Sequence, residues 1–298
     1  MPALGRGWKP IPVIIRAVIT GSVVCLAGTM GWSILLGLNL KFAPSIPWAL
    51  AVMTVLLWTY WRYLGGKGWP RSTAETRRAS LRVQGLSGIL WIWALTAGVL
   101  SVASLVNLQL VYARFVRVPT EQVPDFSRYP FITVLCALLM SAVVAGLMEE
   151  AGFRGYMQVP IERRYGPWTA SIVVAILFGL WHLPHGFAYT APRLPYYFAI
   201  SITYSAIAYL SNSLMPVVAI HACGDAVEFV FVWLRGAPRE KPLLWQSGPD
   251  TAFWAELGLG VVFGLLAISA YRKLASVSQL ERGTSPASHG VDPRPETA

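Results

Sequence analysis

The chain has 298 residues, of which 55% are apolar and 13% charged; its mean hydropathy is +0.53 and its formal net charge +10. Soluble domains carry about 25% charged residues, so this deficit, with apolar runs of about 20 residues, excludes an ordinary soluble domain and indicates an integral membrane protein. The basic residues lie in loops and tails between apolar runs, which fits the positive-inside bias of membrane proteins better than nucleic-acid binding.

Eight apolar runs predict eight transmembrane helices, so we expect an all-α polytopic membrane protein. The runs lie at 17–38, 46–64, 87–112, 131–153, 168–189, 194–211, 215–234 and 251–271. Each can cross about 30 Å of hydrocarbon at 1.5 Å per residue. The excess of basic residues in alternate loops predicts that both termini are cytoplasmic. Arginine outnumbers lysine, as in GC-rich bacterial coding sequences, which favours the inner membrane of a bacterium.

The basic loop after the second run contains residues 71–84, "RSTAETRRASLRVQ". This segment forms either a basic interfacial helix against anionic headgroups or a solvated loop. The three cysteines lie far apart inside apolar runs and indicate neither a disulfide framework nor a metal motif.

Ionisable residues inside the predicted spans are candidates for a functional site, because a charged side chain costs at least about 2.5 kcal/mol at the bilayer centre. The candidates lie in the fourth, fifth and seventh spans: Glu149, Glu150, His182, His221, Asp225 and Glu228. Glu150 and Arg154 are spaced i,i+4 in the favourable order for an ion pair. Glu149 lies about 100° further around the helix and is left to face elsewhere.

Helical spacing also places His221 and Asp225 on one face of the seventh span, where both can reach one cavity. Gly146, Gly152 and Gly224 are expected to let helices approach closely. We expect His182 near the middle of its span. The carboxylates and imidazoles of three helices would then share one level of the membrane.

A carboxylate beside imidazoles can activate water in two ways. A glutamate can act as general base while a histidine orients the water. Alternatively, histidines and carboxylates can hold Zn²⁺, which lowers the pKa of bound water to about 7. A neighbouring histidine can donate to the oxyanion that forms. The zincin signature HExxH is absent, so spacing does not decide between the two ways.

Each residue also has a purely structural interpretation when taken alone. Glu150 with Arg154 can be a helix-end ion pair, His182 a hydrogen-bonded core histidine, and Asp225 a group that bridges helices. The occurrence of the whole set on three helices favours a site.

Three motifs in order carry a resemblance: "EEAGFR" at 149–154, "FGLWH" at 178–182 and "HACGD" at 221–225. They read as EExxxR, FxxxH and Hxxx(N/D), and together they resemble the CPBP family of intramembrane metalloproteases. That family includes the type II CAAX prenyl endopeptidases (Rce1-like) and bacterial Abi proteins. The resemblance spans roughly residues 130–235.

The resemblance implies that Glu149 activates the hydrolytic water together with His182. It implies that Glu150 and Arg154 support this arrangement. His221 and Asp225 would stabilise the oxyanion or contribute to a metal site, whose candidate ligands are Glu149, His182, His221 and Asp225. Zn²⁺ is the implied metal, with a metal-independent glutamate mechanism as the alternative. Asp225 stands where CAAX members often carry Asn. Because Asp is a better metal ligand than Asn, this difference slightly favours the metal site.

Together these observations divide the chain into four parts. Residues 1–129 form a transmembrane region with three spans and the basic cytoplasmic loop, and 130–235 form the catalytic core. Residues 236–272 form the last helix, and 273–298 a disordered cytoplasmic tail. We expect an intramembrane endopeptidase whose partners are membrane lipids and a peptide, near lipid, as substrate. The rival interpretation is a non-catalytic immunity or scaffold factor, or a proton-coupled transporter.

Overall fold

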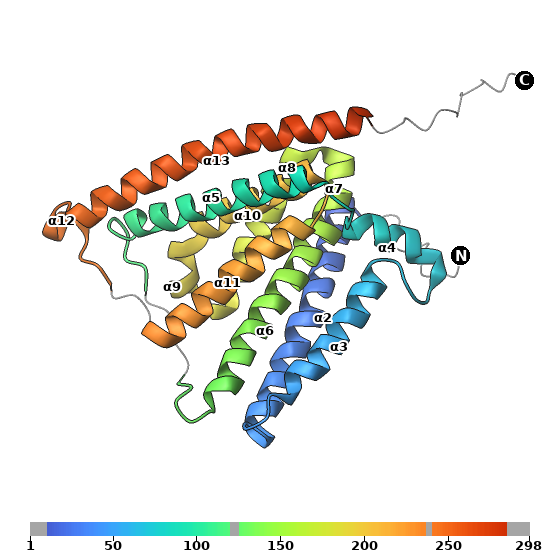
Figure 1. The fold of residues 1–298 in the computed structure, drawn as a ribbon, viewed down its shortest axis with the longest axis horizontal. Helices are drawn as coiled ribbons and strands as arrows, with labels where there is room; N and C mark the ends of the chain where they lie inside the picture. Colours follow the sequence, from blue (N-terminus) through green and yellow to red (C-terminus); the bar gives the residue numbers. More distant parts are fainter. Residues whose placement is uncertain (1–10, 120–124, 237–239, 285–298) are drawn as a thin grey trace, which may run out of the picture.

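The computed structural model describes residues 11–119, 125–236 and 240–284, and these form helices without strands (Figure 1). Six helical segments in this part of the chain are long and apolar enough to cross a membrane: Val13–Phe42, Gly88–Tyr112, Phe131–Tyr165, Pro167–His185, Met215–Arg235 and Thr251–Arg282. The expected all-α polytopic membrane protein is therefore confirmed. The other two predicted spans are also helices, α3 (Trp48–Leu64) and α10 (Leu194–Ser211), but lie outside these six. A count of eight spans stays a prediction.

The fourth predicted span is longer than its apolar run. It begins with α6 (Phe131–Glu150), widens into the π-helix η2 (Ala151–Met157) and continues as α7 (Gln158–Tyr165). Gly166, at φ +87°, ends it with a conformation that side-chain-bearing residues avoid. Pro167 then occupies the first turn of α8 (Pro167–Trp181), where its missing N–H costs nothing.

The helices pack as neighbouring pairs that bring distant parts of the chain together. In Figure 1, α13 (Thr251–Thr284) lies along α5 (Gly88–Tyr112), while α11 (Met215–Arg235) lies beside α6. On the other side of the bundle, α2 (Val13–Phe42) packs against η2. Helix α10 packs against α8 and also contacts η2. The segment containing the two adjacent glutamates is thus enclosed by α2, α10 and α11.

Two of the three glycines that were expected to permit close packing do so. A Cβ on Gly146 would lie 2.8 Å from the Cβ of Ala222 on α11, and a Cβ on Gly152 would lie 2.7 Å from the carbonyl oxygen of Gly21 on α2. Such distances leave no room for a methyl group. Gly224 was predicted wrongly, because its Cβ position has nothing within 4 Å.

Two element boundaries differ from the sequence prediction. The fifth helix ends at Trp181, before Pro184, and the chain continues as the short helices η3 (Leu183–His185) and α9 (Phe187–Thr190). His182 therefore follows the last residue of α8 and does not lie near the middle of a span.

Helix α13 continues to Thr284, past the expected boundary at residue 272, so the tail is helical as far as it is described. Leu274 is fully buried and Ser278 Oγ donates to the carbonyl of Leu210 at 2.6 Å. Packing against α10 thus extends the helix beyond the apolar run. Residues 285–298 lie outside the described part of the chain.

The basic loop contains a helix. After η1 (Arg71–Thr73), α4 spans Ala74–Leu81. Arg77 is buried, and its guanidinium donates to the carbonyls of Tyr63 and Gly68, whereas Arg71 and Arg78 are exposed. The helical alternative is therefore correct, and its contact with anionic headgroups stays a prediction.

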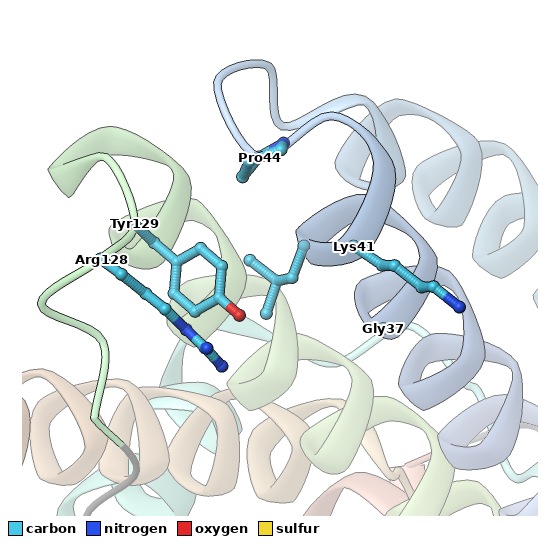
Figure 2. A pocket seen from close by; sticks show the side chains of 6 residues that line it. Gly37, Lys41, Pro44, Arg128 and Tyr129 are labelled. Carbon is cyan, nitrogen blue, oxygen red and sulfur yellow. The ribbon is translucent and has the colours of Figure 1, made fainter.

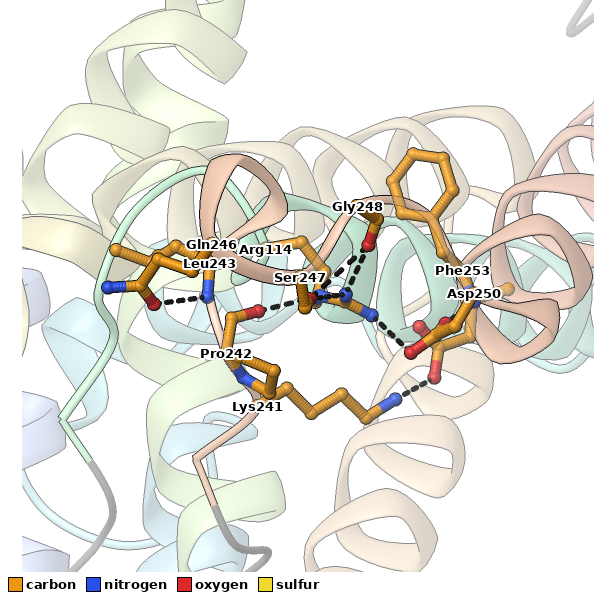
Figure 3. Close-up of polar contacts among 10 residues, drawn as sticks. Arg114, Lys241, Pro242, Leu243, Gln246, Ser247, Gly248, Asp250 and Phe253 are labelled. Atoms are coloured by element: carbon orange, nitrogen blue, oxygen red, sulfur yellow. Dashed lines mark hydrogen bonds and ion pairs between the residues drawn. The ribbon is translucent and has the colours of Figure 1, made fainter.

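A buried arginine joins the end of α5 to the segment that leads into the start of α13. Arg114 is 0% exposed, and Figure 3 shows its guanidinium among groups of the segment that leads into α13. It donates to Pro242 O, Ser247 Oγ, Gly248 O and Asp250 Oδ2 at 2.9–3.1 Å. In return, the carbonyl of Arg114 accepts from the first residue of α12 (Leu244–Ser247) at 2.7 Å.

Asp250 is the charged partner of this arginine. The backbone N–H of Phe253 and the Arg114 guanidinium hold the pKa of the Asp250 carboxyl below its usual value. A lowered pKa means that the contribution of this carboxylate to folding is complete above its unfolded pKa and is lost as pH falls through the folded value.

The close approach of α2 and η2 can be tested by adding one methyl group. Gly21→Ala would place a Cβ 2.6 Å from the carbonyl oxygen of Gly152, so one helix must shift. We expect a loss of about 1–3 kcal/mol, the usual cost of overpacking, measured by unfolding in mixed micelles. Gly31→Ala is the matched control on the same helix, since nothing lies within 4 Å of its Cβ position. Equal stability of the two variants would contradict the packing described.

Candidate functional site

One carboxylate oxygen joins the predicted residues of α6, η2 and α11. Glu150 is fully buried, and its Oε1 accepts from Arg154 Nη1 at 3.1 Å and from His221 Nδ1 at 2.7 Å. The other ring nitrogen of His221, Nε2, lies 3.4 Å from Asp225 Oδ2. The expected pairing of Glu150 with Arg154 is therefore present. It forms the first link of a chain that runs Arg154, Glu150, His221 and Asp225.

The π-helix η2 determines where Arg154 lies. All seven of its residues are buried, and π-turns inside α-helices occur frequently at functional sites. The Arg154 guanidinium lies over the rings of Phe178 and Tyr204, at 4.6 and 5.3 Å from their centroids. Aromatic faces stabilise a desolvated cation. The charge of Arg154 is thus enclosed by rings and neutralised by one carboxylate.

Glu149 has a different environment from its neighbour. It is partly exposed at the end of α6, and it lies close enough to His221 and Asp225 to interact with both electrostatically. The sequence led us to expect that Glu149 faces His221. The direct hydrogen-bond partner of that histidine is instead Glu150, because the π-helical turn and α11 bring Glu150 against the ring.

His182 is held by three contacts at the end of α8. Its Nδ1 lies 2.8 Å from the carbonyl oxygen of Phe178, a partner that requires a proton on Nδ1 and leaves Nε2 as an acceptor. Its ring stacks on Tyr197 with centroids 3.9 Å apart and an angle of 16°. Thr190 Oγ1 donates to its backbone carbonyl at 2.8 Å. His182 also interacts electrostatically with His221 and Asp225, so it belongs to the same cluster.

The sequence analysis missed the contribution of α10. Three of its residues contact the site: Tyr197 on the His182 ring, Ser201 on the Arg154 guanidinium and Tyr204 beside the His221 ring. Ser201 Oγ accepts from Arg154 Nη2 at 2.8 Å, and the Tyr204 and His221 ring centroids are 5.3 Å apart. Their spacing of i, i+4 and i+7 along an otherwise apolar helix was a detectable signal.

The donor set does not form a metal site as it is placed. Within residues 11–119, 125–236 and 240–284, no three His, Cys, Asp or Glu side chains gather closely enough to hold a metal ion. Both ring nitrogens of His221 face carboxylates, and His182 Nδ1 faces a carbonyl. A nitrogen ligand needs its lone pair directed at the metal. We therefore derive no step through zinc, which stays a prediction.

Large cavities elsewhere do not involve the predicted residues. One of about 630 Å³ opens between the end of α2 and the start of α6 (Figure 2). It is lined by Gly37, Leu40, Lys41, Pro44, Arg128 and Tyr129. A second, of about 410 Å³, lies between α2 and α3. Neither is lined by any of the predicted site residues.

Comparison with known proteins finds similarity in the segment that carries the cluster. Residues 131–227 match the model of the type II CAAX prenyl endopeptidase Rce1-like proteins. The matched residues make up about a third of the chain. A 54-residue stretch is also 41% identical to CAAX prenyl protease 2 of Methanococcus maripaludis. That alignment covers 18% of this chain and 18% of the archaeal protein.

The Rce1-like segment coincides with the part of the fold that carries the cluster. It runs from the start of α6 into α11 and contains all the predicted site residues except the candidate Glu228, which follows its last residue. Helices α2 and α3 precede it and α13 follows it, although α2 also packs on η2. The roles of individual residues within this segment stay predictions.

The buried ion pair can be tested through stability. Arg154→Met leaves the Glu150 carboxylate buried with one partner fewer, and breaking a buried pair costs about 3–5 kcal/mol. We expect a loss of that size in unfolding measured in mixed micelles. Arg78→Met, on the exposed face of α4, is the control and should match the wild type. A change at Arg154 no larger than that of the control would contradict the pairing.

Proposed function

We propose that the protein is an intramembrane endopeptidase that hydrolyses a peptide bond with water activated by Glu149 and His182. The observation that carries this proposal is the buried Glu150 carboxylate, which holds Arg154 and His221 together while a second, partly exposed carboxylate lies beside them. The match of residues 131–227 to the model of the Rce1-like proteins supports the same activity.

In the first step, a water hydrogen-bonded to Glu149 attacks the scissile carbonyl carbon while the Glu149 carboxylate accepts a proton from that water. The carbonyl π electrons move to oxygen and a tetrahedral oxyanion forms. In the second step, the carbon–nitrogen bond breaks and the leaving amine takes the proton from Glu149. The products are a free amine and a carboxylic acid, which keeps the second water proton until it ionises in water, and Glu149 returns to its initial state.

The histidines orient water and stabilise charge. Because His182 Nδ1 is bonded to the Phe178 carbonyl, its Nε2 is an acceptor suited to hold the second water proton. His221 Nδ1 donates to Glu150, whereas its Nε2 lies 3.4 Å from Asp225. In the proposal, Nε2–H exchanges this long contact for the carbonyl oxygen of the substrate and stabilises the negative charge that develops there. Glu150 and Arg154 then act by fixing the His221 ring.

The substrate class follows from the setting of the site. The cluster is built on membrane helices, so the scissile bond has to lie within reach of the bilayer, as it does near the terminus of a lipid-proximal peptide. We propose a bacterial inner membrane as the location, with both termini in the cytoplasm and the site open to that side. The archaeal relative is named as a CAAX prenyl protease.

Substitution of the proposed base tests the activity. Glu149→Gln and His182→Ala should each lower turnover of a fluorogenic peptide by about 10²–10⁴-fold, the range of acid–base catalysis, while the elution volume and melting temperature stay unchanged. Glu75→Gln, on the exposed side of α4, is the control. Wild-type turnover by purified Glu149→Gln protein would rule out the mechanism. Full rescue of a deletion phenotype by that variant would favour an immunity or scaffold role.

The role of zinc requires a separate measurement. Elemental analysis of the purified protein, together with turnover before and after a chelator, distinguishes the two mechanisms left open by the sequence. Because both His221 nitrogens face carboxylates, we expect turnover to survive chelation. A stoichiometric metal lost together with activity would instead establish a zinc enzyme and assign the water to the metal.

A further inference from the structure

A buried polar column leads away from the Glu150 carboxylate along the continuous helix of α6, η2 and α7. Glu150, Arg154, Gln158 and Glu162 follow one another at four-residue steps and therefore share one face. The first three are fully buried, and the side chain of Glu162 is 13% exposed. The column thus runs from the buried site to the partly exposed Glu162 over roughly 18 Å, at 1.5 Å per residue.

Helix α10 forms the opposite wall of this column in the same register. Arg154 Nη2 donates to Ser201 Oγ at 2.8 Å, and Gln158 Nε2 donates to the carbonyl of Ser205 at 3.2 Å. Both contacts join residues 47 positions apart, so the two helices run side by side in the same direction. Both serines are fully buried. At the outer end, Arg82 forms an ion pair with Glu162.

Unpaired polar atoms concentrate along this column. Seven buried side-chain nitrogen or oxygen atoms have no hydrogen-bond partner among the residues that the structure describes. Five of the seven belong to the column: Glu150 Oε2, Arg154 Nε, Gln158 Oε1, Ser205 Oγ and Arg82 Nη1. They include both acceptors and donors. Their concentration along one face distinguishes them from isolated defects of packing.

Buried polar atoms without a protein partner bind ordered water, because leaving one unsatisfied costs about 1–3 kcal/mol. We propose that the column holds a file of ordered water molecules, which connects the unpaired Oε2 of Glu150 with the partly exposed Glu162. The column begins at Glu150 and Arg154, which fix the His221 ring, and continues through Gln158 and Ser205, which have no role in the proposed chemistry.

The position of the column beside the site determines what such a file can supply. A protease within the membrane consumes one water for each bond that it breaks, and the surrounding lipid supplies none. The file therefore delivers hydrolytic water to the site, a role that rests on the proposed function.

The first test locates the water itself and does not depend on activity. A crystal structure of the full chain in lipid, at a resolution that shows ordered water, should have water within hydrogen-bond distance of Gln158 Oε1 and Ser205 Oγ. Finding those two atoms bonded to protein groups, or surrounded by apolar side chains without water, would overturn the proposal whatever the enzyme does.

The second test blocks the file. Ser205→Val places two methyl groups beside the unpaired atoms, and it should lower kcat on the order of tenfold while leaving KM unchanged. Ser211→Val is the matched control on α10, since Ser211 Oγ bonds to the carbonyl of Ile207 in its own helix. It should lower stability without lowering kcat.

Gln158→Met provides a second blocking variant if Ser205→Val does not fold, and the same fall in kcat is expected. Unchanged kcat in a folded blocking variant would show that water reaches the site by another path. If the wild type cleaves no peptide, the proposed function fails, and the crystal structure alone then decides whether the file exists.

Discussion

The arrangement of this protein depends on one buried carboxylate. Moving an ion from water into the protein interior costs several kcal/mol even after relaxation. Glu150 offsets that cost with two partners on the same oxygen, Arg154 from the next turn of its own helix and His221 from α11. Neither partner alone would satisfy the charge. Gly146 has no side chain and therefore lets α11 approach α6 at Ala222. This approach is needed to bring His221 to the buried charge, and the bond between them in turn holds the two helices together.

The buried carboxylate also determines the position of Arg154. Arg154 is enclosed by the rings of Phe178 and Tyr204 and anchored by Ser201, so α8 and α10 are fixed by the same group that neutralises Glu150. The π-helical turn places this arginine, and α10 continues the polar wall outward. The proposed site for activating water and the proposed route for supplying it are thus two parts of one helix contact. The stability of the bundle and its proposed chemistry share the same residues.

The sequence was sufficient for what depends on local spacing. The apolar runs identified the helices, and the i,i+4 rule identified the pairing of Glu150 with Arg154. It was insufficient for what depends on three-dimensional packing. Spacing left Glu149 free, but could not show that His221 takes Glu150 as its partner, since that depends on the position of α11. The polar stripe of α10 was missed because its partners lie far along the chain. The helical continuation of α13 past residue 272 was missed because it lies beyond the apolar run and depends on packing against α10.

The central claim is that the glutamate pair divides its work, with Glu150 holding the site together and Glu149 activating water. Cleavage of a peptide in water enriched in oxygen-18, followed by mass spectrometry of the products, tests this most directly. The account predicts that the new carboxyl group carries oxygen-18 with the wild type. It also predicts that folded Glu149→Gln protein forms almost no product. Labelled product at the wild-type rate from Glu149→Gln protein, or no product from the wild type with any lipid-proximal peptide, would contradict it.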